Sequence, residues 1–230
     1  MDTARIAALL QPFLDRSLLP SQLDQISIYI DLLQRWNARI NLTAIRHQEE
    51  IVTRHFGESF FLARHLFTAG TPNSASILAL EGAPSKLPLS GGVRVLDIGS
   101  GAGFPALPLK IWAPHIHLSL IESNHKKAAF LREAARALTL TDIHVITDRA
   151  EALSTRPDSP QAEVVTLRAV GHFETILPQV LPFLSPNGTL ALLIGASQLP
   201  LLNTLTPLKW HPPITIPQSH SRVLSIGVHG

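Results

Sequence analysis

Hydrophobic and polar positions follow two different spacings along this chain. Over the first 67 residues, apolar side chains recur every three or four positions, and examples are Ile6, Leu9, Leu10, Phe13, Leu23, Ile26, Ile30 and Leu33. Such a period places the apolar side chains on one face of an α-helix. It predicts helices over residues 4–14, 23–36 and 48–66.

From Val93 onward, short apolar runs alternate with helical segments. The intervening patterns predict helices that include residues 126–138 and 173–184, whereas the proline-rich run 199–217 is expected to be irregular. The apolar runs predict strands over residues 93–96, 117–121, 143–146, 164–167 and 189–194, and an edge strand over residues 222–228. This alternation is typical of an α/β fold, in which helices cover both faces of a mostly parallel, twisted sheet.

The stretch 68–92 is rich in Ala, Ser, Pro and Gly, a composition that indicates a surface linker. It divides the chain into an N-terminal helical extension over residues 1–67 and a core over residues 93–230. We expect the core to form one globular unit, because its length lies within the range of a single domain.

Composition narrows the function classes. With 230 residues, 45% hydrophobic and 16% charged, the chain has enough apolar material for a sizeable core and too little charge for disorder. Absence of cysteine excludes disulfides and thiolate nucleophiles, and the 11 histidines lack the spacing of a metal motif, so we expect no metal. No apolar stretch reaches the roughly 18 residues of a membrane span. No secretory signal precedes the first helix, so we expect a soluble, cytoplasmic protein.

The formal net charge is only +2, so overall charge says little about partners. Basic side chains nevertheless gather in two places, which are Arg35, Arg39, Arg46, Arg54, His55, Arg64 and His65, and then Lys126, Lys127 and Arg132. Such clusters can attract phosphates, although most of them are solvated helix faces. Lys126 and Lys127 open a predicted helix, where cations are unfavourable, which favours an external anion there.

The segment 95–105, which reads VLDIGSGAGFP, carries the chemical signal. It lies where a buried parallel strand ends and a helix begins, and open α/β sheets bind ligands in that crevice. Gly99, Gly101 and Gly103 allow the backbone to approach a ligand closely. Glu122 follows the next predicted strand, where a carboxylate can accept both hydroxyl hydrogens of a ribose.

Two cofactor classes compete for this motif, and a glycine-rich turn without a ligand is the third interpretation. A nicotinamide fingerprint needs a small residue where Phe104 stands, so that match fails. Asp97, two residues before the first glycine, suits a cofactor with a cationic amino-acid group. S-Adenosylmethionine has an ammonium, a sulfonium and a ribose but no phosphate, and it is the cofactor we predict.

These residues are similar to motif I of the class I methyltransferases, which have a Rossmann-like fold. The chain as a whole resembles the bacterial glucose-inhibited division protein B family, also called ribosomal RNA small-subunit methyltransferase G. The matching stretches are residues 36–37, 41–46, 50–55, 97–105, 123–124, 126–127, 130–132, 149–151, 168–169 and 221–224. Departures from the family pattern are Ile194 in place of a lysine, Glu58 in place of an aspartate, and a longer linker.

The resemblance implies methyl transfer from S-adenosylmethionine to N7 of a guanine in small-subunit ribosomal RNA. The RNA, alone or within a ribonucleoprotein particle, is the implied partner, and the helical extension would face it. Together with the motif argument, the resemblance gives as cofactor contacts Asp97, Gly99, Gly101, Gly103, Phe104, Glu122, Ala150, Glu151 and Arg168. As RNA contacts it gives Asn41, Arg46, Arg54, Lys126 and Lys127.

For several of these residues a structural role is the alternative. His55 is expected to be a packed, hydrogen-bonded core histidine. Phe104 packs under the cofactor or belongs to the core, and Asn41 contacts RNA or caps a helix.

Guanine N7 carries a free lone pair and needs no general base, so no catalytic residue is predicted. A non-catalytic RNA-binding protein and a small-molecule methyltransferase are the rival functions. The modified nucleotide, the assembly state of the RNA and the oligomeric state stay open.

Overall fold

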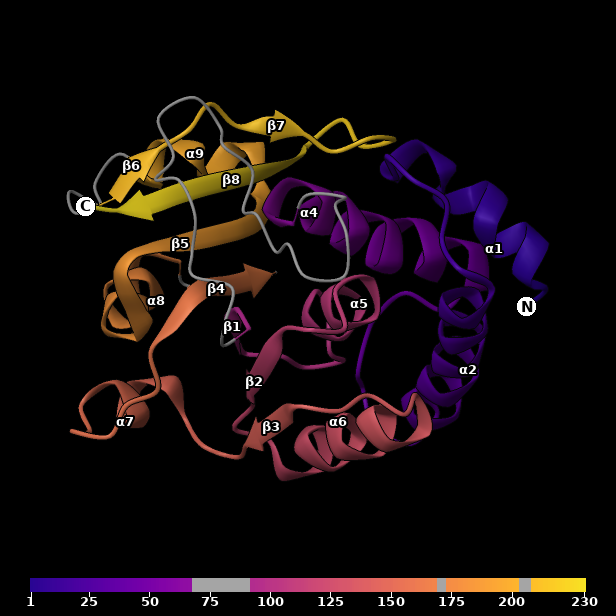
Figure 1. Ribbon diagram of the computed structural model, residues 1–230, viewed down its shortest axis with the longest axis horizontal. Helices are drawn as coiled ribbons and strands as arrows, with labels where there is room; N and C mark the ends of the chain where they lie inside the picture. Colours follow the sequence, from indigo (N-terminus) through magenta and orange to yellow (C-terminus); the bar gives the residue numbers. More distant parts are fainter. Residues whose placement is uncertain (68–91, 169–172, 203–207) are drawn as a thin grey trace.

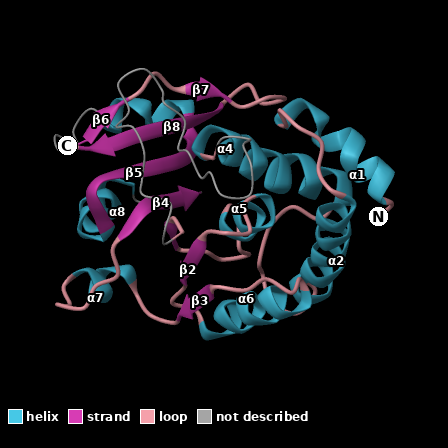
Figure 2. Ribbon diagram, viewed as in Figure 1, coloured by secondary structure: helices cyan, strands magenta, loops and turns pink. Residues whose placement is uncertain are grey.

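The computed structural model describes residues 1–67, 92–168, 173–202 and 208–230. Within them an eight-stranded sheet forms the centre of the molecule, and helices cover both of its faces (Figures 1 and 2). The expected α/β architecture is thereby confirmed. The predicted linker 68–92 lies outside the described residues apart from Gly92. None of the described helices is long and apolar enough to cross a membrane.

The sheet has the order β3-β2-β1-β4-β5-β8-β6, with β7 paired to β8 beside this path. Strands β1 to β5 are mutually parallel, and β8 runs antiparallel to its neighbours. The bounds are β1 Arg94–Ile98, β2 His117–Ile121, β3 Ile143–Ile146, β4 Ala162–Arg168, β5 Leu184–Gly195, β6 Leu208–Trp210, β7 Ile214–Thr215 and β8 Arg222–His229. Because the order reverses between β1 and β4, ligands of this fold bind outside the carboxyl ends of these two strands.

The prediction of β8 as an edge strand is wrong, because β5 lies on one side of it and β6 and β7 lie on the other. The proline-rich run is also more regular than expected, since it supplies β6 and β7. Pro212 and Pro213 lie between these two strands. Proline has no N–H to donate to a neighbouring strand. Because both prolines lie in the connection, the residues of β6 and β7 keep their N–H groups and pair with β8.

The helices are α1 Thr3–Leu10, α2 Pro20–Asn37, α3 Gln48–Glu50, α4 Glu58–Leu66, α5 Ala106–Trp112, α6 His125–Ala137, α7 Ala150–Ser154, α8 Phe173–Val180 and α9 Leu199–Leu202. The single helix predicted over residues 48–66 is interrupted by a π-helical segment, Ile51–Gly57. The helix predicted over residues 173–184 ends at Val180 and continues as a 3-10 turn, Leu181–Phe183. Pro182 has no backbone N–H, which accounts for this early end.

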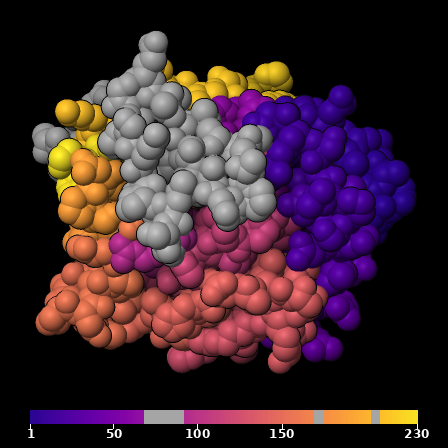
Figure 3. All heavy atoms as spheres, viewed as in Figure 1, coloured from indigo at the N-terminus to yellow at the C-terminus, as the bar shows by residue number. Residues whose placement is uncertain are grey.

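Two hydrophobic clusters lie on opposite faces of the sheet, as alternation along each strand requires. On β1, for example, Val95 belongs to one cluster and Leu96 to the other. The first cluster also contains Ile6, Ile30 and Phe56, so the N-terminal helices share a core with the sheet. In the space-filling view their indigo atoms lie directly against the magenta and pink atoms of the middle of the chain (Figure 3). Division into an extension and a core stays our interpretation of the sequence.

Candidate functional site

The glycine-rich loop after β1 is held to the end of β2. The backbone N–H of Gly101 donates to the Glu122 carboxylate over 2.8 Å. At Gly103 the backbone has a φ of +81°, and a Cβ there would collide with the Tyr29 hydroxyl, which donates to the carbonyl of Ala102. The third glycine of the motif is therefore required by its conformation and by the tyrosine packed against it.

Glu122 is buried, and each of its carboxylate oxygens accepts one backbone hydrogen bond. One oxygen accepts from Gly101, and the other accepts from the N–H of Asn124 over 2.8 Å. A carboxylate has about four lone-pair positions, so two acceptor positions remain for a ligand. This geometry suits a vicinal diol such as that of a ribose.

A cavity of about 210 Å³ opens beside Glu122. It lies outside the carboxyl ends of β1, β2 and β3 and is lined by Ile98, Gly99, Ile121, Glu122, Ser123, Asp148, Arg149, Ala150, Glu151 and Ile176. Four predicted cofactor contacts, Gly99, Glu122, Ala150 and Glu151, therefore share one cavity. Asp148 also lines the cavity and was not among the predicted contacts, although its place two residues after the end of β3 is a usable signal.

Asp97, near the end of β1, is unusual because the residue is 1% exposed and its carboxylate is incompletely paired. Its Oδ1 accepts a hydrogen bond of 2.6 Å from the hydroxyl of Thr166, the residue opposite it on β4. Its Oδ2 has no hydrogen-bond partner within the described part of the chain. Burial raises the pKa of Asp97 to about 6, against the lowering effect of the Thr166 hydroxyl.

A buried carboxylate oxygen without a partner is costly, and an external cation is the simplest partner for it. The ammonium of an amino acid would suit Asp97, while the diol of a ribose would suit Glu122. Both groups are present in S-adenosylmethionine, so the residues of this site fit that molecule.

Arg168, a predicted cofactor contact, ends β4 and faces a different set of groups. Its Nη2 donates to the Glu58 carboxylate over 3.1 Å and to the carbonyl of Arg54 over 2.8 Å. Its Nη1 lies 2.8 Å from Nδ1 of His55. Burial lowers the pKa of Arg168 to about 10, which still leaves it charged at neutral pH. The structure thus places Arg168 beside Arg54, a predicted RNA contact.

His55 is a buried, hydrogen-bonded histidine, as the sequence analysis expected. Burial, followed by the charges of Arg168, Arg54 and Arg222, lowers the pKa of His55 to about 2, so the ring is neutral. Because Arg168 can only donate, Nδ1 must accept and Nε2 must carry the proton. Nε2 then donates to the hydroxyl oxygen of Thr43 over 2.7 Å.

Phe104 is also buried, in agreement with the core alternative for this residue. Its ring stacks on His55 with centroids 4.6 Å apart and on Tyr29 with centroids 5.2 Å apart. Whether it also contacts the cofactor stays a prediction.

The loop that contains Asn41 is organised by a residue that the sequence analysis did not single out. The Asn37 side chain accepts from the N–H groups of Leu42 and Thr43 and donates to the Thr43 carbonyl. Arg46 closes the loop by donating to the Asn37 carbonyl over 3.0 Å. Asn41 itself is exposed and accepts a long bond of 3.5 Å from Arg46.

Lys126 and Lys127 lie in the first turn of α6, at the same edge of the sheet as Glu122. Their backbone N–H groups donate to the Asn124 side chain, which caps the helix. Ile194, by contrast, is buried in the core cluster, so β5 carries an apolar side chain where the family commonly has lysine.

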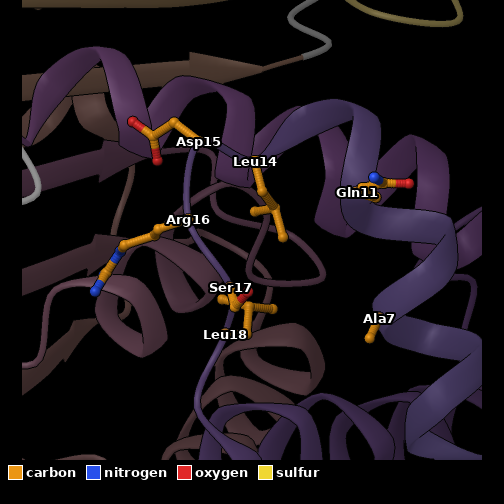
Figure 4. A pocket seen from close by; sticks show the side chains of 7 residues that line it. All are labelled: Ala7, Gln11, Leu14, Asp15, Arg16, Ser17 and Leu18. Atoms are coloured by element: carbon orange, nitrogen blue, oxygen red, sulfur yellow. The ribbon is translucent and has the colours of Figure 1, made fainter.

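A second cavity, of about 330 Å³, lies among residues 7–18 beside α1 (Figure 4). In Figure 4 the Arg16 side chain points away from Ala7 and Gln11. Its guanidinium donates to the Trp112 carbonyl and lies 4.1 Å from the Trp112 ring centroid. The cavity contains no residue from the carboxyl ends of the strands. Among the described residues no group of three or more histidine or acidic side chains could hold a metal ion.

The model of the family described as rRNA small subunit methyltransferase G matches residues 22–77 and 80–206. The chain belongs to this family. A relative of that name from Roseiflexus castenholzii is 41% identical over 73% of this chain and 66% of its own length. The Bacillus subtilis member is 34% identical over 79% of this chain and 67% of its own length. The alignments with the first three relatives cover 62 to 66% of their length.

Solved structures share the fold of this family member at low sequence identity. Fibrillarin from Methanococcus jannaschii, described as a pre-rRNA processing protein, superposes with a TM-score of 0.51 at 16% identity. The match covers 63% of this chain and 70% of that chain. Fibrillarin in a complex with Nop5p gives a TM-score of 0.52 at 15% identity, over 72% of this chain and 92% of that chain. The Rossmann-like methyltransferase fold predicted from the sequence is confirmed.

Proposed function

We propose that this protein transfers a methyl group from S-adenosylmethionine to N7 of a guanine in small-subunit ribosomal RNA. The observation that carries the proposal is the buried, unpaired Oδ2 of Asp97, the residue before Ile98, which lines the cavity together with Glu122. Membership of the rRNA small subunit methyltransferase G family supplies the substrate class. A cytoplasmic location follows from this substrate.

The residues divide the cofactor between them. Asp97 would hold the ammonium, Glu122 the ribose hydroxyls, and the wall of Ala150 and Glu151 the adenine. The bound cofactor supplies an electrophilic methyl group on its sulfonium. Gly99 and Gly101, where an added Cβ would make no close contact, would keep side chains out of its path, whereas Gly103 is required by its packing against Tyr29.

Methylation at N7 requires no general base from the protein. The N7 lone pair lies on the major-groove edge of the base and carries no proton. The protein's contribution is to align the base with the methyl group and to exclude water. His55, a buried imidazole that accepts from Arg168 at the end of β4, has a pKa of about 2, so it is a poor general base. We therefore assign no catalytic residue.

The RNA is proposed to lie against the carboxyl edge of the sheet and the adjoining N-terminal loop. Lys126, Lys127, Arg46 and Asn41 are exposed or half-buried there, and Arg54 is 44% exposed at its side chain. Phosphate contacts of this kind fix position and carry no base specificity.

Tritium transfer from labelled S-adenosylmethionine tests the proposal. The purified protein should label small-subunit ribosomal RNA, either free or in assembled subunits, and leave large-subunit RNA unlabelled. Borohydride–aniline cleavage, which breaks RNA at 7-methylguanosine, should then give one major stop. The Asp97→Asn variant is the control for cofactor dependence.

Other outcomes of this assay identify the rival functions. Binding of RNA without any label would favour a non-catalytic RNA-binding protein. Labelled small molecules with unlabelled RNA would favour a small-molecule methyltransferase. A cleavage-resistant labelled RNA would refute the N7 assignment.

A further inference from the structure

Three arginines from distant parts of the chain converge on one buried glutamate. Glu58 opens α4 and has a side chain that is 1% exposed. It accepts from Arg54 over 3.3 Å, from Arg168 over 3.1 Å and from Arg222 over 2.9 Å. Arg222 begins β8 and lies opposite Gly195, the last residue of β5. We call these four side chains the arginine cluster.

The arginine cluster has more positive than negative charge. Arginine keeps its proton in proteins, so three guanidiniums share the Glu58 carboxylate, and the charge of Arg168 also lowers the pKa of Asp97. Glu50 adds only a distant contact of 4.0 Å with Arg54, and both of these side chains are nearly half exposed. His55 is neutral and cannot repel an anion. Like charges brought together at a partly buried site are unfavourable unless an external anion is present.

The cluster also contains a hydrogen-bond donor without an acceptor. Nε of Arg168 is buried and has no hydrogen-bond partner within the described residues. The Arg168 side chain is only 9% exposed, so water does not easily satisfy this donor. A planar guanidinium is well suited to a phosphate because two of its N–H groups can point at two oxygens.

The location separates this cluster from the cofactor cavity. The cavity lies at the carboxyl ends of β1, β2 and β3, whereas the cluster lies at the ends of β4, β5 and β8. Arg222 donates to the carbonyl of Leu193 on β5, which fixes it on that side of the sheet. The cofactor's amino-acid end is expected at Asp97, on β1, and the other substrate should approach from the β4 side.

We propose that Arg54, Arg168 and Arg222 form a receptor for one backbone phosphate of the RNA substrate. Glu58 is the positioning residue that holds the three guanidiniums together. Through the buried His55 and through Thr43 the receptor is hydrogen-bonded to the loop that contains Asn41. The inference rests on the proposed function for the identity of the ligand.

RNA binding by the full chain tests the receptor. The probe is a transcript of small-subunit ribosomal RNA, and its Kd is measured over a range of salt concentrations. Arg222→Gln should raise the Kd about tenfold or more, as expected for loss of a charge-assisted contact. It should also reduce the slope of log Kd against log salt concentration by about 0.7–0.9, the value for one lost phosphate contact. Arg222→Lys should keep the salt dependence and lose affinity, because it keeps the charge without the planar fork.

Arg94→Gln is the matched control. Arg94 also pairs with a carboxylate, that of Glu163, but it lies at the amino end of β1, the opposite edge of the sheet. This variant should bind RNA like the wild type.

Calorimetry with S-adenosylhomocysteine distinguishes the two possible anions. If the arginines bound the cofactor's carboxylate, Arg222→Gln would weaken S-adenosylhomocysteine and leave RNA affinity unchanged, which would overturn the proposal. Unchanged affinity for both ligands would overturn it as well. The expected result is weaker RNA binding with the cofactor affinity unchanged within about twofold.

The Glu58→Gln variant distinguishes a positioning role from a charge effect, because the two roles predict opposite changes in RNA affinity. It removes a negative charge, so a simple charge effect would tighten RNA binding. Because the guanidiniums lose their common anchor, we expect weaker binding and a slower single-turnover rate, with partial recovery in Glu58→Asp. Tighter RNA binding would refute the role of Glu58, and the Arg222 variants test the receptor even if Glu58→Gln fails to fold.

The receptor and the proposed function can fail separately. RNA binding that depends on Arg222 without methyl transfer would contradict the enzymatic function and support the receptor. Methyl transfer and RNA binding that do not change in Arg222→Gln would support the enzymatic function and contradict the receptor. Absence of RNA binding by the wild type would overturn both.

Discussion

Affinity for the cofactor should depend on pH through Asp97. In the free protein its buried carboxylate has a pKa of about 6. Cofactor binding through an ammonium requires the ionised form, which is about nine tenths populated at pH 7 and about one tenth at pH 5. The Kd for S-adenosylhomocysteine should therefore rise about tenfold between pH 7 and pH 5.

The same shift has a consequence for stability, and its sign follows from the direction of the shift. The folded state binds the Asp97 proton more tightly than the unfolded state, so ionisation of Asp97 opposes folding. The cost is absent below about pH 4, grows as the pH rises through 6, and reaches about 3 kcal/mol at neutral pH. A bound ammonium should offset much of this cost, so the cofactor should raise the Tm more at pH 7 than at pH 5.

Calorimetric titrations at pH 5, 6 and 7 measure the effect, with 5′-methylthioadenosine as the control ligand because it lacks the ammonium. Its affinity should change little over this range. In Asp97→Asn the affinity for S-adenosylhomocysteine should be low and nearly independent of pH. Equal affinity at pH 5 and pH 7 in the wild type would refute the pairing of Asp97 with the ammonium. The same fall for 5′-methylthioadenosine would do so too.

The remaining predictions concern the ribose, the glycine-rich loop and the chemical step. Glu122→Ala should weaken S-adenosylhomocysteine by about 1.5–3 kcal/mol, the range for hydrogen bonds to a charged group, and unchanged calorimetric affinity would remove Glu122 from the site. Gly103→Ala should lower the free energy of unfolding in urea by clearly more than Gly99→Ala, because both backbones have positive φ but only Gly103 has neighbours within reach of a Cβ. Equal losses would show that the contact with Tyr29 is unimportant. With both substrates saturating, the single-turnover rate should be nearly flat from about pH 6.5 to 9, and a tenfold rise per pH unit would reveal a general base.

The clustering of residues around the cavity could be predicted from the sequence because its signals are local. The loop from Asp97 to Gly103 is one short segment after a strand, and Glu122 and Ala150 follow the next two strands in order. In a parallel sheet the carboxyl ends of neighbouring strands share an edge, so their order along the chain predicts their proximity. The cavity brings these elements together as that argument expects.

The arginine cluster could not be predicted in this way. Glu58 and Arg222 are 164 positions apart and belong to a helix and an antiparallel strand. Arg222 reaches the site only because β8 lies beside β5, whereas the sequence analysis placed it at the edge of the sheet. Strand order is not encoded in the local pattern of apolar positions. Because β8 was predicted as an edge strand, the sequence did not indicate that Arg222 lies near Glu58 and Arg168. The role of Asn37 was missed for another reason, because Asn41 and Thr43 nearby offered equally good capping side chains.

Buried charged groups in this chain differ in whether all their polar atoms have partners, and this difference distinguishes structural from functional groups. Lys110 is 1% exposed, yet its ammonium donates to the carbonyls of Pro114 and Ile116, which gives it a structural role at the end of α5. Asp97 is 1% exposed and the Arg168 side chain is 9% exposed, and each retains a polar atom without a partner in the described residues. The two groups have opposite charges and lie on neighbouring strands, β1 and β4, where the strand order reverses. Because a buried anion and a buried cation each keep one polar atom without a partner at this point, the site is suited to two ligands of complementary charge. A cationic methyl donor at Asp97 and an anionic nucleic acid at Arg168 meet that requirement, and a pair of neutral small molecules does not.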